Sequence, residues 1–89
     1  MKRKKVYKLI DGERKYQNTV RIENEGDTRK DDEKCVAEFL IYMENKLNEA
    51  KNDVYKLDIQ GALANIRKVT ALGVAAMESH ETLPRLWKK

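Results

Sequence analysis

The chain has 89 residues, of which 40% are hydrophobic and 38% charged, and a formal net charge of +4. This length corresponds to a single domain with one modest core. With one proline and four glycines the sequence has too few turn residues for an all-β fold, and it contains no run of about 18 apolar residues that would span a membrane. We expect one helical domain over residues 1–89, in which 1–5 and 81–89 are flexible or partner-contacting tails.

Charge is distributed unevenly along the sequence. Residues 1–21 contain eight Lys/Arg and two Asp/Glu, residues 22–53 contain five and ten, and residues 54–89 contain six and three. This pattern is explained either by solvated helix faces with a basic tail or by an anion-binding surface built from the first and last thirds. The basic run Lys2–Lys5 is too short to indicate a nucleic-acid-binding arm.

The cysteine content and the N-terminus both bear on the compartment. Cys35 is the single cysteine and cannot form an intramolecular disulfide. The basic N-terminus lacks the long apolar stretch of a signal peptide. We therefore expect a cytosolic protein in which Cys35 is a buried, structural residue.

The first expected element is a helix over residues 5–22, because the apolar residues in this range fit a helical spacing. These residues are Val6, Leu9, Ile10, Tyr16 and Val20. The pair Asp11-Gly12 would interrupt such a helix, and a short strand at Val6–Ile10 is the alternative interpretation. The polar stretch 23–30 then predicts a loop.

A second helix is expected from an N-cap at Asp31 to about Asn52. Apolar residues recur along it in steps of three and four, which predicts one buried stripe. The stripe consists of Val36, Phe39 or Leu40, Met43, Leu47 and Ala50. Residues 53–58 are expected to form a connector whose apolar side chains cover the end of the core.

Asp58 is the expected N-cap of a third helix that ends at about Ser79. Its stretch Ala62–Met77 is apolar on nearly every side, which predicts burial on nearly every side. Two neighbouring helices cannot provide that cover, so we expect a homo-oligomer. Gly73 is expected where another helix approaches closely. The predicted fold is all-α, with antiparallel second and third helices in a bundle completed by oligomerisation.

Arg67 and Lys68 interrupt this apolar helix and are the first candidates for ligand contact. A guanidinium near buried surface needs an anionic or carbonyl partner, which is either a carboxylate such as Glu44 or a phosphate. Arg14, Tyr16 and Gln17 would complete a pocket, with the Tyr16 ring available to stack on a base. His80 is either a solvated residue at a helix end or a hydrogen-bond donor to a phosphate or base.

The sequence contains no pattern that indicates a nucleophile with its base. One histidine and one cysteine cannot form a structural zinc site within one chain. Glu44 and Glu49 are the only weak candidates for a metal ligand, and their five-residue spacing suits a shared cation poorly. We therefore predict no catalytic residue, no metal site and no cofactor.

Two segments carry a family resemblance: MENKLNEA (43–50) and ANIRKVTALGVAAMESH (64–80). With GERKYQ (12–17), they resemble small MazG-like proteins of tailed bacteriophages. This resemblance implies an all-α oligomer in an infected bacterial cytoplasm, and for intact MazG enzymes it implies Mg²⁺-dependent hydrolysis of nucleoside triphosphates to pyrophosphate. The family's paired acids are replaced here, since Leu47 and Arg67-Lys68 stand where acids are required. Such a pocket would hold phosphate directly and not through a metal.

The residues and the resemblance lead to three hypotheses of function: a binding protein, an enzyme and a protein-interaction module. The leading hypothesis is an oligomer that binds a nucleotide, a cyclic nucleotide or a related signal without turnover, as a sponge against host defence. The alternatives are a divergent MazG-like pyrophosphohydrolase that uses Mg²⁺, and a protein-interaction module that inhibits a host protein. Neither a membrane nor a nucleic acid is an expected partner.

Overall fold

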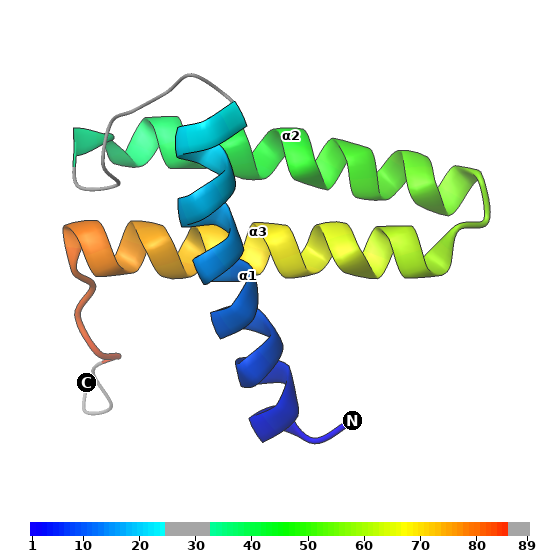
Figure 1. The fold of residues 1–89 in the computed structure, drawn as a ribbon, viewed down its shortest axis with the longest axis horizontal. Coiled ribbons are helices and arrows are strands. Elements are labelled where there is room, and N and C mark those ends of the chain that lie inside the picture. The colour runs from blue at the N-terminus through cyan, green and yellow to red at the C-terminus, as the bar shows by residue number, and fades with distance from the viewer. Residues whose placement is uncertain (25–32, 86–89) are drawn as a thin grey trace.

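The computed structural model describes residues 1–24 and 33–85, which form three helices and no strand (Figure 1). They are α1 (Arg3–Asn24), α2 (Val36–Tyr55) and α3 (Ile59–His80). α2 and α3 run antiparallel as a long hairpin, and α1 crosses this hairpin steeply (Figure 1). In the described residues α1 packs against α3 and not against α2. The expected all-α chain of three helices is confirmed.

α1 is one continuous helix that passes through Asp11-Gly12 without a break. The alternative strand at Val6–Ile10 is therefore wrong, and the helix exceeds the expected range 5–22 by two residues at each end. A Cβ added at Gly12 would meet no atom within 4 Å, so this glycine lies in open space and serves no packing role. A continuous helix also places part of the basic N-terminal run, from Arg3 onward, in regular structure.

α2 starts later than expected because a different residue caps it. Cys35 is the N-cap, and its backbone N–H donates to the Glu38 carboxylate at 3.2 Å. This is the second half of a capping box, in which the N3 side chain reaches back to the cap. Glu33 and Lys34 consequently lie outside the α-helix, while the proposed cap Asp31 lies outside the described residues. Cys35 is exposed, so its expected burial is wrong.

The turn between α2 and α3 has only three residues, Lys56 to Asp58. The Asp58 N–H donates to the Asp53 carbonyl at 2.8 Å, and the Leu57 N–H donates to the Val54 carbonyl at 3.0 Å. With Leu57 at a φ of 61°, these are the bonds of a Schellman motif. The expected connector 53–58 is thus too long, because α2 continues to Tyr55. Its apolar residues do not cover the core: Val54, Tyr55 and Leu57 are exposed.

Asp58 caps α3 as expected, since its carboxylate accepts the Gly61 N–H at 2.9 Å. The same end of the hairpin is held by a polar pair between the two helices. The Asn65 amide donates to the Asp53 carboxylate at 2.7 Å, and Asn65 is only 9% exposed. A buried amide of this kind needs such a partner, so the pair fixes the position of α3 against α2.

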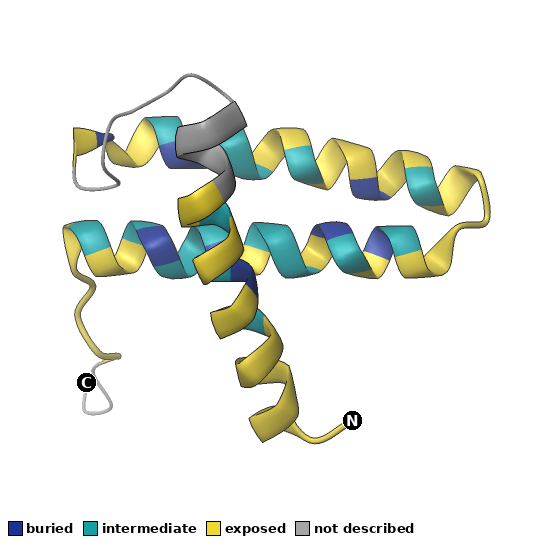
Figure 2. Ribbon diagram, viewed as in Figure 1, coloured by how far each residue is buried: buried dark blue, intermediate teal, exposed yellow. Residues whose placement is uncertain are grey.

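The core of the described chain is small and consists mostly of alanine. Its buried hydrophobic residues are Phe39, Ala50, Ala62, Ala71 and Ala75. Figure 2 shows buried positions on both helices of the hairpin. The expected stripe of α2 is only partly right, because Val36, Leu40 and Leu47 are exposed. Gly73 meets α2 only loosely, since a Cβ there would lie 3.6 Å from Met43 Cε.

The chain exposes more surface than a folded monomer of its mass. Its accessible area is 7366 Å² for 10.4 kDa, whereas the usual scaling gives about 5,400 Å². Its radius of gyration is 14.5 Å, against about 12 Å for a compact domain of this length. The expected burial of α3 on nearly every side is not reached within one chain. Among the described helices none is long and apolar enough to cross a membrane.

Candidate anion site at the crossing of α1 and α3

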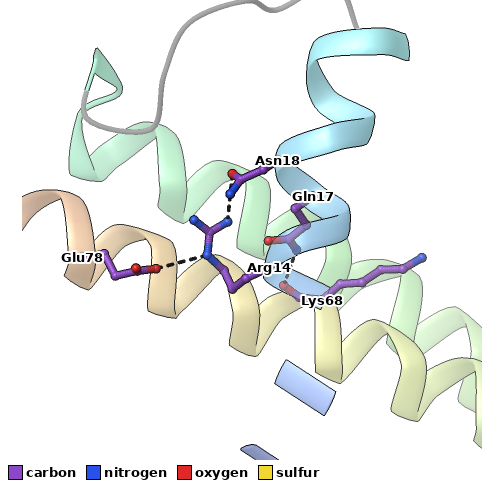
Figure 3. Close-up of polar contacts among 5 residues, drawn as sticks. All are labelled: Arg14, Gln17, Asn18, Lys68 and Glu78. Carbon is purple, nitrogen blue, oxygen red and sulfur yellow. Dashed lines mark hydrogen bonds and ion pairs between the residues drawn. The ribbon is translucent and has the colours of Figure 1, made fainter. Parts of the chain in front are cut away.

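Gln17 joins α1 to α3 at the point where the two helices cross. Its Nε2 donates to the Lys68 carbonyl at 3.2 Å, as Figure 3 shows. The other amide atom, Oε1, is buried and has no hydrogen-bond partner among the residues that the structure describes. Gln17 therefore holds the crossing through one bond and leaves one buried acceptor unsatisfied, which is uncommon in folded proteins.

Arg67 is tied to α1 by a short ion pair. Its Nε donates to Glu13 Oε1 at 2.8 Å, and the Glu13 side chain is 7% exposed while that of Arg67 is 40% exposed. The carboxylate partner expected for Arg67 was Glu44 of α2, and that assignment is wrong, because the crossing helix α1 brings Glu13 closer. The Arg67 Nε is used in this bond, and within residues 1–24 and 33–85 no other ion pair engages its two terminal amino groups, which can donate to a further acceptor.

Tyr16 and Lys68 belong to the same two helix segments as the Glu13–Arg67 pair. Tyr16 is three residues after Glu13, which places the two side chains together on the surface of α1, and its ring is exposed. The Lys68 side chain extends away from Gln17 and Arg14 (Figure 3). The Lys68 carbonyl oxygen accepts this bond from Gln17, and among the described residues the Lys68 ammonium has no ion pair. We call Tyr16, Gln17, Arg67 and Lys68 the crossing site.

Arg14 lies on the other flank of α1. Its Nε donates to Glu78 at 3.2 Å, and its Nη1 contacts Asn18 Oδ1 at 3.5 Å (Figure 3). Glu78 is ten residues beyond Lys68 on α3, or about 15 Å along the helix axis. Arg14 therefore fastens the crossing from the side opposite Tyr16, and it does not face the crossing site.

His80 is separate from the other candidate residues. It is twelve residues beyond Lys68, about 18 Å along α3. Its Nε2 contacts the Lys34 carbonyl at 2.5 Å, and its ring meets Phe39 edge-on, with centroids 6.1 Å apart. His80 thus fastens the segment before α2 to the end of α3.

Lys34 is a buried cation that the sequence pattern did not indicate. It is 2% exposed, and its Nζ lies 5.4 Å from the centroid of the Tyr42 ring. This distance is typical of a cation–π contact. Lys34 precedes the helix and lies outside any periodic pattern, so the spacing of residues gave no signal for its burial.

The two acids that would support a metal-dependent enzyme do not meet. Glu44 is exposed on α2, and Glu49 pairs with Lys46 at 3.2 Å on the same helix. Across residues 1–24 and 33–85 no three His, Cys, Asp or Glu side chains are grouped as metal ligands would be. The carboxylates at the crossing itself, Glu13 and Glu78, are each paired with an arginine.

Comparison with known proteins gives no relative. No protein-family model, no curated protein and no solved structure matches the chain. The resemblance to MazG-like proteins stays a prediction.

Proposed function

We propose that this protein is a homo-oligomer that binds a nucleotide or a nucleotide-derived signal at the crossing site without turning it over. One observation carries the proposal. Gln17 of α1 donates to the Lys68 carbonyl and Glu13 of α1 accepts from Arg67, so two segments about fifty residues apart in sequence meet at the crossing, and Tyr16 is exposed on α1 three residues after Glu13. Cationic groups beside an exposed aromatic ring suit a ligand with a phosphate and a base.

Each residue of the crossing site has a distinct part in this proposal. The terminal amino groups of Arg67 and the Lys68 ammonium would bind phosphate oxygens, and the Glu13 carboxylate would orient the guanidinium through Nε. The Tyr16 ring would stack on the base. Gln17 would hold the two helices at a fixed separation through the Lys68 carbonyl. Arg14 and His80, which also were candidates, would act by stabilising the fold around this site.

Binding without turnover is favoured by how the nearby acids are used. Hydrolysis of a nucleoside triphosphate with Mg²⁺ needs carboxylates that hold the metal. Glu13 and Glu78 are instead engaged by Arg67 and Arg14. The phage setting and the removal of a signal from a host defence system follow from the resemblance alone, and we include them in the proposal on that basis.

The test is calorimetric titration of the full chain with a panel of nucleoside mono-, di- and triphosphates and cyclic mono- and dinucleotides. Lys68→Ala is the informative variant, because it removes the ammonium and keeps the carbonyl that Gln17 uses. We expect the affinity for the bound nucleotide to fall at least tenfold, about 1.4 kcal/mol. Lys15→Ala is the matched control, since Lys15 is exposed and pairs only with Asp11 in the described chain.

Two results would reject the proposal. If the wild-type protein binds no member of the panel, the proposed nucleotide ligand is wrong. If Lys68→Ala and Lys15→Ala bind the nucleotide with equal affinity, the crossing site is not where it binds. Release of pyrophosphate from a triphosphate in the presence of Mg²⁺ would replace binding by hydrolysis.

A further inference from the structure

α3 carries a row of exposed apolar residues, which we call its seam, on a side that the described parts of α1 and α2 leave largely uncovered. Ile59, Leu63, Ile66 and Met77 are 55%, 49%, 48% and 51% exposed. With Thr70 and Gly73 between them, these positions follow steps of four, three, four, three and four residues. This spacing is that of a contact line between two helices. α3 meets α1 through Arg67 and α2 through Asn65, so the seam belongs to its third side.

α2 carries a matching row. Val36, Leu40, Leu47 and Val54 follow steps of four and seven, and each is 45% to 60% exposed. In an antiparallel pair, side chains displaced in the same rotational sense from the mutual contact lie on the same face. On α2 the mutual contact includes Phe39 and Ala50, and on α3 it includes Ala62 and Val69. Seen along each helix from its N-terminus, the exposed row is rotated away from these contact residues in the same direction on both helices. They therefore form one apolar face of the hairpin, on the side away from α1.

The apolar face consists of Val36, Leu40, Leu47, Val54, Ile59, Leu63, Ile66 and Met77. A large exposed group of apolar side chains on one face of a protein marks an interaction site. The accessible area exceeds that of a compact monomer by about 2,000 Å², and a stable interface covers about 800 Å² on each partner. Burial of the apolar face against a second copy would account for part of this excess.

Large and small side chains alternate along the seam of α3 in such a way that two copies of it can pack against each other. When two copies of α3 are set antiparallel about Lys68, Leu63 meets Gly73, Ile66 meets Thr70 and Ile59 meets Met77. In the first two pairs a large side chain faces a small one, so knobs of one copy meet holes of the other. Gly73 has room for this within one chain, because only Met43 Cε lies within 4 Å of a Cβ built there.

We propose that the apolar face binds a second copy of this chain, with the two α3 helices antiparallel about Lys68, to form a four-helix core from two α2–α3 hairpins. α1 lies outside this core in each copy. This inference goes beyond the ligand proposal, since it would hold even if the crossing site bound nothing.

The first test measures molecular mass in solution by light scattering at micromolar concentration. The wild-type mass should be at least twice the 10.4 kDa of one chain, and Ile66→Lys should lower it. Leu9→Lys is the matched control, because Leu9 is also 48% exposed but lies on α1. A wild-type mass near 10.4 kDa, or a mass that Ile66→Lys leaves unchanged, would overturn the proposal and leave the face to a different partner.

The second test addresses orientation and does not depend on a disruptive charge. Ile66→Cys and Thr70→Cys are prepared separately, each with Cys35→Ser, and are mixed and oxidised. An antiparallel pair should give the mixed disulfide dimer in excess over either symmetric dimer. A statistical mixture or an excess of the symmetric dimers would overturn the antiparallel arrangement.

A third test exchanges the large and small residues of one contact. Gly73→Leu should lower the molecular mass in solution, and adding Leu63→Ala to the same chain should restore it.

Discussion

The Arg67 Nε donates to Glu13 Oε1 at 2.8 Å, and this contact joins a nearly buried carboxylate to a guanidinium that is 40% exposed. Among the α1 side chains that the structure describes, Val6, Leu9 and Tyr16 are exposed and do not provide a comparable attachment. α1 is therefore held on α3 largely by polar contacts. Its orientation across the hairpin depends on Glu13 and on the Gln17 bond to Lys68.

The two partners of this ion pair should differ in their effect on stability. Arg67→Ala leaves the Glu13 carboxylate buried without a partner and should cost about 1–3 kcal/mol of unfolding free energy. Glu13→Ala leaves a guanidinium that water can reach, so it should cost less than Arg67→Ala. Urea unfolding followed by circular dichroism measures both. Equal losses of unfolding free energy in the two variants would contradict this expectation, and would mean that water reaches the Glu13 carboxylate in solution.

A double variant separates the pair from its surroundings. If the two groups interact, Glu13→Ala combined with Arg67→Ala should be less destabilised than the sum of the single variants. Additive losses would contradict the contact. Lys15→Ala in the same series should lie within about 0.5 kcal/mol of wild type, because exposed pairs contribute little.

The sequence allowed the helices to be predicted better than their contacts. The Asp58 cap is a local signal, and α3 begins there. The second helix begins after Cys35, whose backbone N–H donates to the Glu38 carboxylate, and the apolar spacing that predicted this helix carries no signal for that cap. Each of α2 and α3 has two apolar sides, so the pattern did not reveal which side faces the other helix. The partners Glu13 and Arg67 are 54 residues apart, and no local pattern connects them.

Leu57 occupies a backbone conformation that favours glycine. Its φ is 61° at the C′ position of a Schellman motif, and its side chain is exposed. A non-glycine residue in the left-handed region costs about 1–2 kcal/mol, and the greater freedom of glycine in the unfolded chain offsets part of this. Leu57→Gly should raise the unfolding free energy by about 0.5–1 kcal/mol. A lower midpoint in thermal unfolding would show that Leu57 stabilises the turn by contacts of its own.

Gly61 and Gly12 should respond in opposite ways to the same substitution. A Cβ at Gly61 would overlap the Asp58 carboxylate that caps α3, whereas a Cβ at Gly12 would meet nothing within 4 Å. Gly61→Ala should therefore destabilise the protein by about 1 kcal/mol, the usual value of an N-cap. Gly12→Ala should stabilise it by up to about 1 kcal/mol through helix propensity. Stabilisation by both changes would show that Asp58 moves without losing its bond to Gly61.

The contact between Lys34 and Tyr42 should depend on the aromatic ring and not on the hydroxyl. The Lys34 Nζ lies 5.4 Å from the ring centroid, and Lys34 is 2% exposed. Tyr42→Phe keeps the ring and should change the unfolding free energy little. Tyr42→Leu removes the attraction to the cation and should cost about 1–2 kcal/mol. Tyr7→Leu, at a residue that is 62% exposed on α1, is the control for loss of an aromatic ring alone. If Tyr42→Phe were as destabilising as Tyr42→Leu, the hydroxyl would be the important group, and the segment before α2 would be held by a hydrogen bond in place of the cation–π contact.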